Sequence, residues 1–326
     1  MPLNALPVET LPLPTPYAVG PVNSYLIAAD PLTMVDAGVN TVDAENALRL
    51  GFASRGLALD SVGRILITHA HPDHYGLVPW LQNMSGASAF MGDQDLQRIS
   101  GDATHWEFRR LLLEAGFPQE ELKTLAERER RVHRVHRVAE MKCSPVYDGQ
   151  SFEFRDFILE AISLPGHTAG HIGYYEPHSG SFFAGDTLLP HFSRNPLLEP
   201  ILEPEGESPA QRRRSLKQYL ESLDRLEALD LRTVYPGHGP VIDNPAETIR
   251  YMRTHYASRL EVVSACLSAT GKSAYQVSGE LYPSRNCYDH FLAVSEVLAH
   301  LDVLVGQGRA SHEIREDGIE YFCRPG

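Results

Sequence analysis

One short run of metal-binding side chains, HAHPDH at residues 69–74, constrains this chain more than any other feature. It directly follows RILIT, an apolar run typical of a short buried β-strand. Four side chains that can bind a metal cannot all lie on one face of a regular helix or strand when they are this close in sequence. We therefore predict a tight loop at a strand end. There, His69 and His71 point toward one ion, while Asp73 and His74 turn toward another.

Three further candidate ligands occur in similar settings later in the chain. His167 lies in LPGHTAGH, Asp186 in FFAGDTL and His238 in YPGHGP. Each follows a short apolar strand pattern and stands beside glycine, where the backbone can turn sharply and let a side chain face a cavity. Imidazole and carboxylate ligands suit zinc, iron or manganese. The sequence therefore predicts that these segments converge on a metal site.

The alternation of strand and helix patterns indicates an α+β fold of two packed sheets with helices outside. Strand patterns occur at 23–29, 32–38, 64–68, 88–92, 151–154, 157–163, 171–176, 181–186 and 233–238. Helix patterns occur at 41–55, 75–85, 93–99, 210–229 and 245–268. We expect residues 1–268 to form one domain.

Residues 102–142 differ in composition, being rich in Leu, Glu and Arg. They predict two helices broken at a Gly-Phe-Pro sequence, as a helical insertion beside the metal site. Two interpretations of the basic end, 128–142, remain open. It is either a surface that grips an anionic substrate or a solvated helix face with Val132, Val135 and Val138 packed inward. Nearby glutamates dilute the positive charge and favour the second.

The C-terminal residues 269–326 predict a small winged-helix domain. A helix pattern at 273–282 and an amphipathic helix at 291–308 are followed by alternation around an Asp-Gly pair, which is a hairpin signal. Winged helices often bind DNA through the helix before the wing. Residues 289–305 contain no Lys or Arg, which favours a structural role over DNA recognition.

Composition limits the partners that we expect. The 326 residues carry a formal net charge of −13, so nucleic acid is a poor default partner and a small-molecule substrate is favoured. The four cysteines lack C-x-x-C spacing and fit reduced thiols in a reducing compartment. The N-terminal segment does not resemble a signal peptide, and no apolar run is long enough for a membrane span. We expect a cytoplasmic protein, and the sequence leaves a homodimer open.

Five segments in a fixed order carry a resemblance to a known family. They are VDAG (35–38), HAHPDH (69–74), PGHT (165–168), AGDT (184–187) and PGHG (236–239). Over roughly residues 15–260 the chain resembles the metallo-β-lactamase superfamily. The resemblance implies a four-layer αβ/βα sandwich, with metals at the edge of the two sheets in the domain 1–268.

The resemblance also implies a role for each candidate ligand. His69, His71 and His167 would bind one metal, and Asp73, His74 and His238 a second, with Asp186 bridging both. The full set favours two divalent ions, of which zinc is expected and iron or manganese are alternatives. Asp36 would lie behind the site and orient a ligand, and a supporting hydrogen bond is expected for His171. No cysteine occupies a ligand position, unlike in the antibiotic-destroying branch.

The expected chemistry is hydrolysis. Two metal ions that share a water supply hydroxide near neutral pH, and Asp73 could hold that water and receive its proton. The leading hypothesis is a hydrolase of small esters, thioesters or lactones. His191, Phe192 and Tyr235 are candidates for the substrate pocket, although each has an ordinary structural alternative.

Several other functions remain open at this point. Glyoxalase II shares the ligand pattern, but its glutathione loop is replaced here by LLPHFSRNP. The whole arrangement is similar to the β-lactamase-like-protein-2 group, some of which are endoribonucleases, so the second hypothesis is a single-strand-specific phosphodiesterase. An iron-dependent sulfur dioxygenase and a winged-helix DNA-binding regulator are further alternatives.

Overall fold

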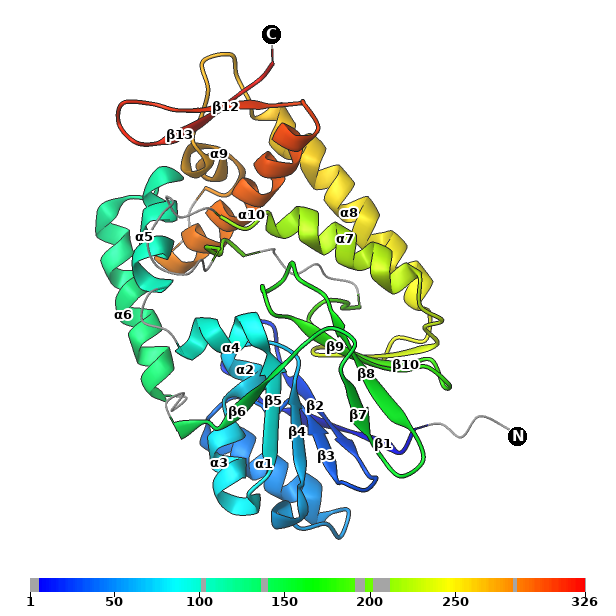
Figure 1. The fold of residues 1–326 in the computed structure, drawn as a ribbon. Coiled ribbons are helices and arrows are strands. Elements are labelled where there is room, and N and C mark those ends of the chain that lie inside the picture. The colour runs from blue at the N-terminus through cyan, green and yellow to red at the C-terminus, as the bar shows by residue number, and fades with distance from the viewer. Residues whose placement is uncertain are drawn as a thin grey trace.

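The structure, a computed structural model, describes residues 6–100, 104–135, 140–190, 197–201, 212–283 and 286–325. Two β-sheets face each other (Figure 1). The first has the strand order β1 (Val8–Leu13), β2 (Val22–Ile27), β3 (Thr33–Val35), β4 (Arg64–Ile67), β5 (Ser88–Gly92) and β6 (Cys143–Val146). The second has the order β11 (Thr233–Pro236), β10 (Ser181–Gly185), β9 (Ile172–Glu176), β8 (Ile158–Ser163) and β7 (Ser151–Glu153).

Helices cover the outer side of each sheet. They are α1 (Val42–Ala53) and α3 (Val78–Ser85) on the first sheet, and α7 (Ser215–Glu227) and α8 (Pro245–Ala265) on the second. Between the sheets, aromatic and branched side chains such as Tyr25, Leu66 and Phe183 form the central core. The predicted four-layer αβ/βα sandwich is confirmed, because each sheet buries one face on its partner and the other on helices.

Polar loops gather where neighbouring parallel strands end. Strands β3, β4, β5 and β6 run parallel, so their carboxyl ends meet at one edge of the first sheet. Two helices start at this edge: the single-turn α2 (Pro72–Tyr75) and α4 (Asp93–Ser100). A short 3₁₀ turn, η1 (Leu59–Ser61), precedes β4. This edge therefore receives the HAHPDH segment, whereas the segments of His167, Asp186 and His238 follow β8, β10 and β11 of the second sheet.

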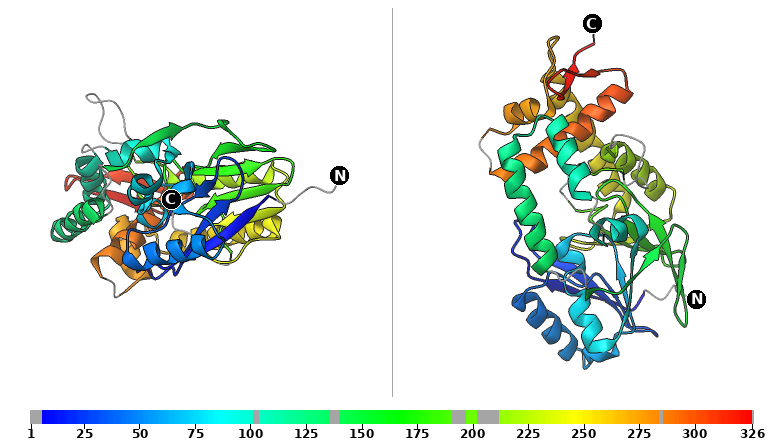
Figure 2. Two further views of the ribbon diagram at one scale, coloured as in Figure 1. Left: turned by 90° about the horizontal axis from the view of Figure 1, so that it is seen from below. Right: turned by 60° about the vertical axis from the view of Figure 1, so that its left-hand side comes forward.

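A helical region lies beside the sandwich. It consists of α5 (Thr104–Glu114), α6 (Gln119–Val135), α9 (Ala274–Leu281) and α10 (Cys287–Gly306). These helices share one hydrophobic core with part of α8. Helix α6 runs from the C-terminal helices to the first sheet (Figure 2), where Asn40 Nδ2 donates a 2.6 Å hydrogen bond to the carbonyl oxygen of Val135. The predicted pair of helices in the insertion is confirmed.

A two-stranded hairpin ends the chain. Strand β12 (Ser311–Ile314) pairs with β13 (Glu320–Cys323) after the two helices α9 and α10, in the predicted order. The winged-helix assignment of 269–326 and the boundary after residue 268 stay predictions. Among the helices that the structure describes, none is both long enough and apolar enough to cross a membrane.

The structure also differs from the sequence prediction. Strands β1 and β6 were not predicted, because each contains a proline that weakens a strand pattern. Both are edge strands of the first sheet, where Pro12 and Pro145 are tolerated. The helix predicted at 75–85 is α3, which begins at Val78, and the single-turn α2 before it was not predicted. The inward packing predicted for Val135 is wrong, since this side chain is 46% exposed. Val132 and Val138 lie outside the described side chains.

Candidate metal centre

The HAHPDH loop begins where β4 ends. The carboxylate of Asp36, which follows β3, accepts 2.8 Å hydrogen bonds from the backbone N–H and the hydroxyl of Thr68. Asp36 has a left-handed backbone conformation with φ 58°, which Asp tolerates better than most residues. Helix α2 then starts at Pro72, because the fixed φ of proline suits the first helical position. This turn separates His69 and His71 from the residues that follow.

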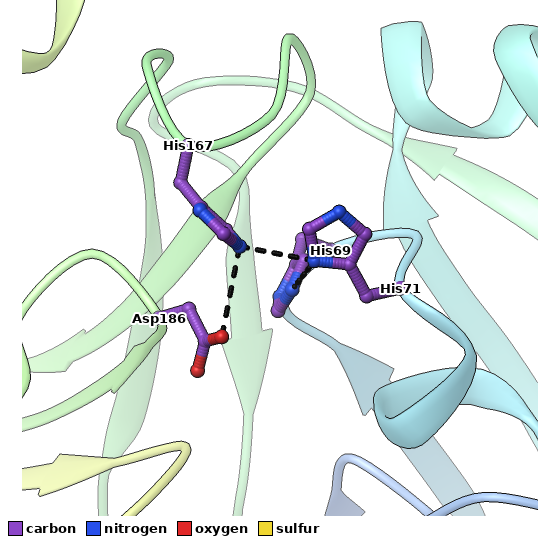
Figure 3. Close-up of side chains that lie close together, drawn as sticks. All are labelled: His69, His71, His167 and Asp186. Atoms are coloured by element: carbon purple, nitrogen blue, oxygen red, sulfur yellow. Dashed lines mark hydrogen bonds and ion pairs between the residues drawn. The ribbon is translucent and has the colours of Figure 1, made fainter. Parts of the chain in front are cut away.

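Four side chains from three loops form the first cluster: His69, His71, His167 and Asp186. His71 Nδ1 lies 2.8 Å from His69 Nε2 and 3.0 Å from His167 Nε2. His167 Nε2 lies 3.6 Å from Asp186 Oδ2 (Figure 3). The potential ligand atoms all lie within 4.8 Å of one another. Residues 117 positions apart in the sequence, His69 and Asp186, are thus brought to one point.

The second cluster consists of Asp73, His74 and His238, also with ligand atoms within 4.8 Å of one another. His238 Nε2 lies 3.3 Å from Asp73 Oδ2. The carboxylate of Asp186 lies between the clusters. Its Oδ1 is 3.6 Å from His74 Nε2 and 3.7 Å from His238 Nε2, while its Oδ2 faces the first cluster.

The second ring nitrogen of several histidines is held by the protein. His74 Nδ1 lies 2.7 Å from Asp36 Oδ2, His238 Nδ1 lies 2.8 Å from the carbonyl oxygen of Pro21, and His69 Nδ1 lies 3.1 Å from the hydroxyl of Thr68. Such contacts fix the ring orientation and the tautomer in metal sites. They direct Nε2 of each ring into the site.

The donor set fits metal ions. His74 Nε2 and His238 Nε2 are buried and have no hydrogen-bond partner among the described residues. Leaving such an atom without a partner costs about 1–3 kcal/mol, and a cation would satisfy both. Neutral imidazoles with carboxylates are the ligands that zinc, iron and manganese accept.

A family model described as metallo-beta-lactamase superfamily matches residues 17–238. The chain belongs to the metallo-β-lactamase superfamily. The probable metallo-hydrolase YqjP of Bacillus subtilis is 31% identical over 300 residues, covering 91% of this chain and 92% of the relative. An atrochrysone carboxyl ACP thioesterase of Passalora fulva is 21% identical over 312 residues, covering 92% and 75%.

A solved structure extends the similarity to nearly the whole fold. A metallo-beta-lactamase family protein from Thermus thermophilus superposes with a TM-score of 0.81 at 29% identity, covering 98% of this chain and 99% of that one. The protein is therefore a metallo-β-lactamase-fold hydrolase, with a histidine and aspartate cluster that could bind metals.

The electrostatics of this superfamily site favour cations. Burial lowers the pKa of His69 well below its ordinary value, and neighbouring imidazoles add to the effect. Burial also lowers the pKa of His74, but the carboxylates of Asp36, Asp186 and Asp73 outweigh it and raise that pKa to about 9. Several carboxylates thus lie around His74, where a metal ion would compete with a proton for the ring nitrogen.

His171 lies behind the two clusters. Its Nε2 accepts a 3.2 Å hydrogen bond from the backbone N–H of Asp186, and its Nδ1 lies 3.1 Å from the hydroxyl of Thr187. Its ring stacks on His69 with centroids 5.0 Å apart. Burial lowers the pKa of His171 to about 4, so the ring is neutral near pH 7. These contacts agree with a supporting role, which stays a prediction.

Two predicted pocket residues, His191 and Phe192, lie outside the described residues. Tyr235 is half-buried and packs at the edge of the core between the sheets. Its ring stacks on Phe183 with centroids 4.9 Å apart and meets Tyr25 edge-on at 5.3 Å. A role for Tyr235 in a substrate pocket stays a prediction.

Sequence reasoning missed residues that hold the ligand loops. Asn23 Nδ2 donates hydrogen bonds to the carbonyl oxygens of Pro236 and Gly239, on either side of the His238 loop. Asp95, in α4, is completely buried and contacts two ligand loops. The available signal was its place just after β5, the parallel neighbour of β4.

Proposed function

We propose that this chain hydrolyses a small ester, thioester or lactone with the aid of two divalent metal ions, with zinc as the native metal. The observation that carries the proposal is the position of Asp186. One carboxylate oxygen faces the first cluster and the other faces the second. A carboxylate in this position suits a bridging ligand, which is why we propose a two-metal centre.

In this proposal His69, His71 and His167 hold one cation, and Asp73, His74 and His238 hold the other. When bound, such cations polarise a carbonyl and bring the pKa of a water down to about 7. The chain itself supplies proton handling. Asp73 is 7% exposed and is positioned, with one oxygen 3.3 Å from His238 Nε2, to accept a proton released in the reaction. The hydrogen bonds to the histidine rings keep these ligands in place during turnover.

One observation supports an acyl substrate, and another argues against DNA binding. A relative that aligns with most of the chain carries the name of a thioesterase. Helix α10, the candidate DNA-reading helix, is buried along most of its length against α6, α8 and α9. A helix covered in this way cannot enter a DNA groove, so we propose a structural role for it.

A second candidate is cleavage of single-stranded RNA. It is favoured by Arg130 and Arg131, which are exposed on α6 and could contact an anionic strand. The net charge of −13 counts against it.

One experiment separates these candidates. The protein is loaded with Zn²⁺, its metal content is measured, and hydrolysis of a thioester, a lactone and a single-stranded RNA is followed in parallel. We expect two metal ions per chain, hydrolysis of the thioester or lactone, and loss of metal and turnover in Asp186→Asn. Asp224→Asn, a surface substitution, is the matched control. A wild-type protein that binds no metal under any loading condition would falsify the proposal. RNA cleavage alone, lost in Arg131→Ala, would establish the second candidate.

A further inference from the structure

Asp95 is an aspartate in the first turn of α4 that is completely buried. Buried carboxylates are rare in proteins unless their oxygens are paired. Here Oδ2 accepts 2.7 Å hydrogen bonds from the backbone N–H of Ala70 and from the hydroxyl of Thr168. Oδ1 accepts a 2.8 Å hydrogen bond from the backbone N–H of Gly170. A single carboxylate therefore holds two loops that are far apart in the sequence.

These loops carry the histidines of the first cluster. Ala70 is the residue between His69 and His71, and Thr168 directly follows His167. Arg98, three residues after Asp95 on the same face of α4, donates a 2.9 Å hydrogen bond to the carbonyl oxygen of Ala70. One turn of helix α4 thus holds both the N–H and the C=O of Ala70.

Helix α4 and the His167 loop also meet backbone to backbone. A Cβ atom added to Gly170 would lie 2.3 Å from the backbone nitrogen of Asp95. A Cβ atom added to Gly92, just before α4, would lie 1.9 Å from the carbonyl oxygen of Gly170. Glycine at both positions permits the close approach that brings the Asp95 carboxylate within reach of Gly170.

A different carboxylate contacts the second cluster directly. Asp36 contacts the His74 ring and also Thr68, the residue before His69, whereas Asp95 contacts the loops of His69, His71 and His167. We propose that Asp95 is a positioning residue that sets the spacing of these three histidines and so determines the metal affinity of the first cluster. This inference rests on the proposed two-metal function.

Asp95→Asn tests this role with little change in shape. An amide has one acceptor oxygen, so its NH₂ group must face a hydrogen-bond donor that the carboxylate now satisfies. Loss of such supporting contacts typically lowers metal affinity by about 10–100-fold. We expect a loss of that size at the first cluster and much less change at the second. Asp93→Asn, on the same helix and bonded to Gln97, is the matched control.

The measurement is a Co²⁺ titration of the full chain, followed by visible absorption in competition with a chelator. Selective weakening of one of the two sites in Asp95→Asn, with Asp93→Asn unchanged, supports the inference. Thr168→Val and Thr168→Ser provide a second pair that does not depend on Asp95→Asn folding. Valine removes the hydroxyl that bonds Asp95, whereas serine keeps it, so serine should restore the affinity.

The outcomes separate this inference from the proposed function. If wild type binds two Co²⁺ ions and both Asp95→Asn and Thr168→Val bind them with wild-type affinity, the positioning role is wrong and the metal centre stands. If wild type binds no Co²⁺, the proposed function fails and the inference fails with it.

Discussion

The ring of His74 lies between two carboxylates that follow strands of different sheets. Its Nδ1 lies 2.7 Å from Asp36 Oδ2, at the end of the first sheet, and its Nε2 lies 3.6 Å from Asp186 Oδ1, at the end of the second. All three side chains are at most 2% exposed. Two negative charges around one buried imidazole suit a site that exchanges a proton for a metal ion.

Asp36→Asn should therefore weaken metal binding at the second cluster by about 10–100-fold. Asparagine tolerates the left-handed backbone of this position. The substitution removes the charge and also turns an NH₂ group, in place of an acceptor oxygen, toward Thr68 or His74. Isothermal titration calorimetry measures the Zn²⁺ affinity of the variant. Asp43→Asn, at an exposed position on α1, is the control. Unchanged affinity in Asp36→Asn would show that this carboxylate does not orient His74.

Gly92→Ala should destabilise the protein because its Cβ atom would overlap the carbonyl oxygen of Gly170. Backbone cannot move as a flexible side chain can, so we expect a loss in the range of about 1–3 kcal/mol. Gly279→Ala in helix α9 is a matched control, since its added Cβ meets no described atom within 4 Å beyond its chain neighbours and the backbone of its own helix. For Gly279→Ala we expect a gain in stability of about 0.5–1 kcal/mol. Urea unfolding measures both, and equal effects of the two substitutions would contradict the predicted contact.

Arg212→Met should also lower stability. Arg212 bonds two buried carboxylates, with Nη1 2.6 Å from Glu320 Oε2 and Nε 3.0 Å from Asp302 Oδ2. Removing one partner from a buried ion pair costs about 3–5 kcal/mol. Arg253→Met breaks exposed pairs with Asp224 and Glu227 and should cost about 0–1 kcal/mol. Urea unfolding of both variants measures the two losses of stability. Equal losses would show that solvent screens the ion pairs of Arg212.

Glu199→Gln should change how stability depends on pH. Burial raises the pKa of Glu199 to about 7, despite the opposing charge of Arg98. The folded state then retains a proton that the unfolded state loses above its ordinary pKa of about 4.5, so wild-type stability falls as pH rises from about 4.5 through 7.

Glutamine has no proton to lose, and the variant should therefore gain stability relative to wild type between pH 5 and pH 8. Thermal unfolding at the two pH values measures this gain. Glu316→Gln, an exposed position between β12 and β13, controls for the change of net charge. A constant difference between Glu199→Gln and wild type across this range would rule out the raised pKa.

Local patterns in the sequence were sufficient for much of the fold. Strand ends and sharp turns depend on residues that are close in sequence. The apolar strand before His69 and the glycines beside His167 and His238 therefore show where strands end and where side chains can face a cavity. The fixed order of the five matching segments indicated the four-layer sandwich. The helix patterns were found within a few residues, because apolar periodicity survives in the sequence whatever the helix packs against.

Tertiary structure decided which groups meet. The place of Asp95 just after β5 puts it near the site edge, but only the close approach of Gly170 and Ala70 makes it a buried acceptor. The edge strands β1 and β6 contain prolines, so their pairing with neighbours, not their own pattern, makes them strands. The types of metal ligand that the chain carries could be predicted from the sequence, because side-chain type and turn-forming residues are local features. Only the folded chain fixes which ring nitrogen faces the site and which carboxylate lies behind it, since these contacts join residues that are distant in sequence.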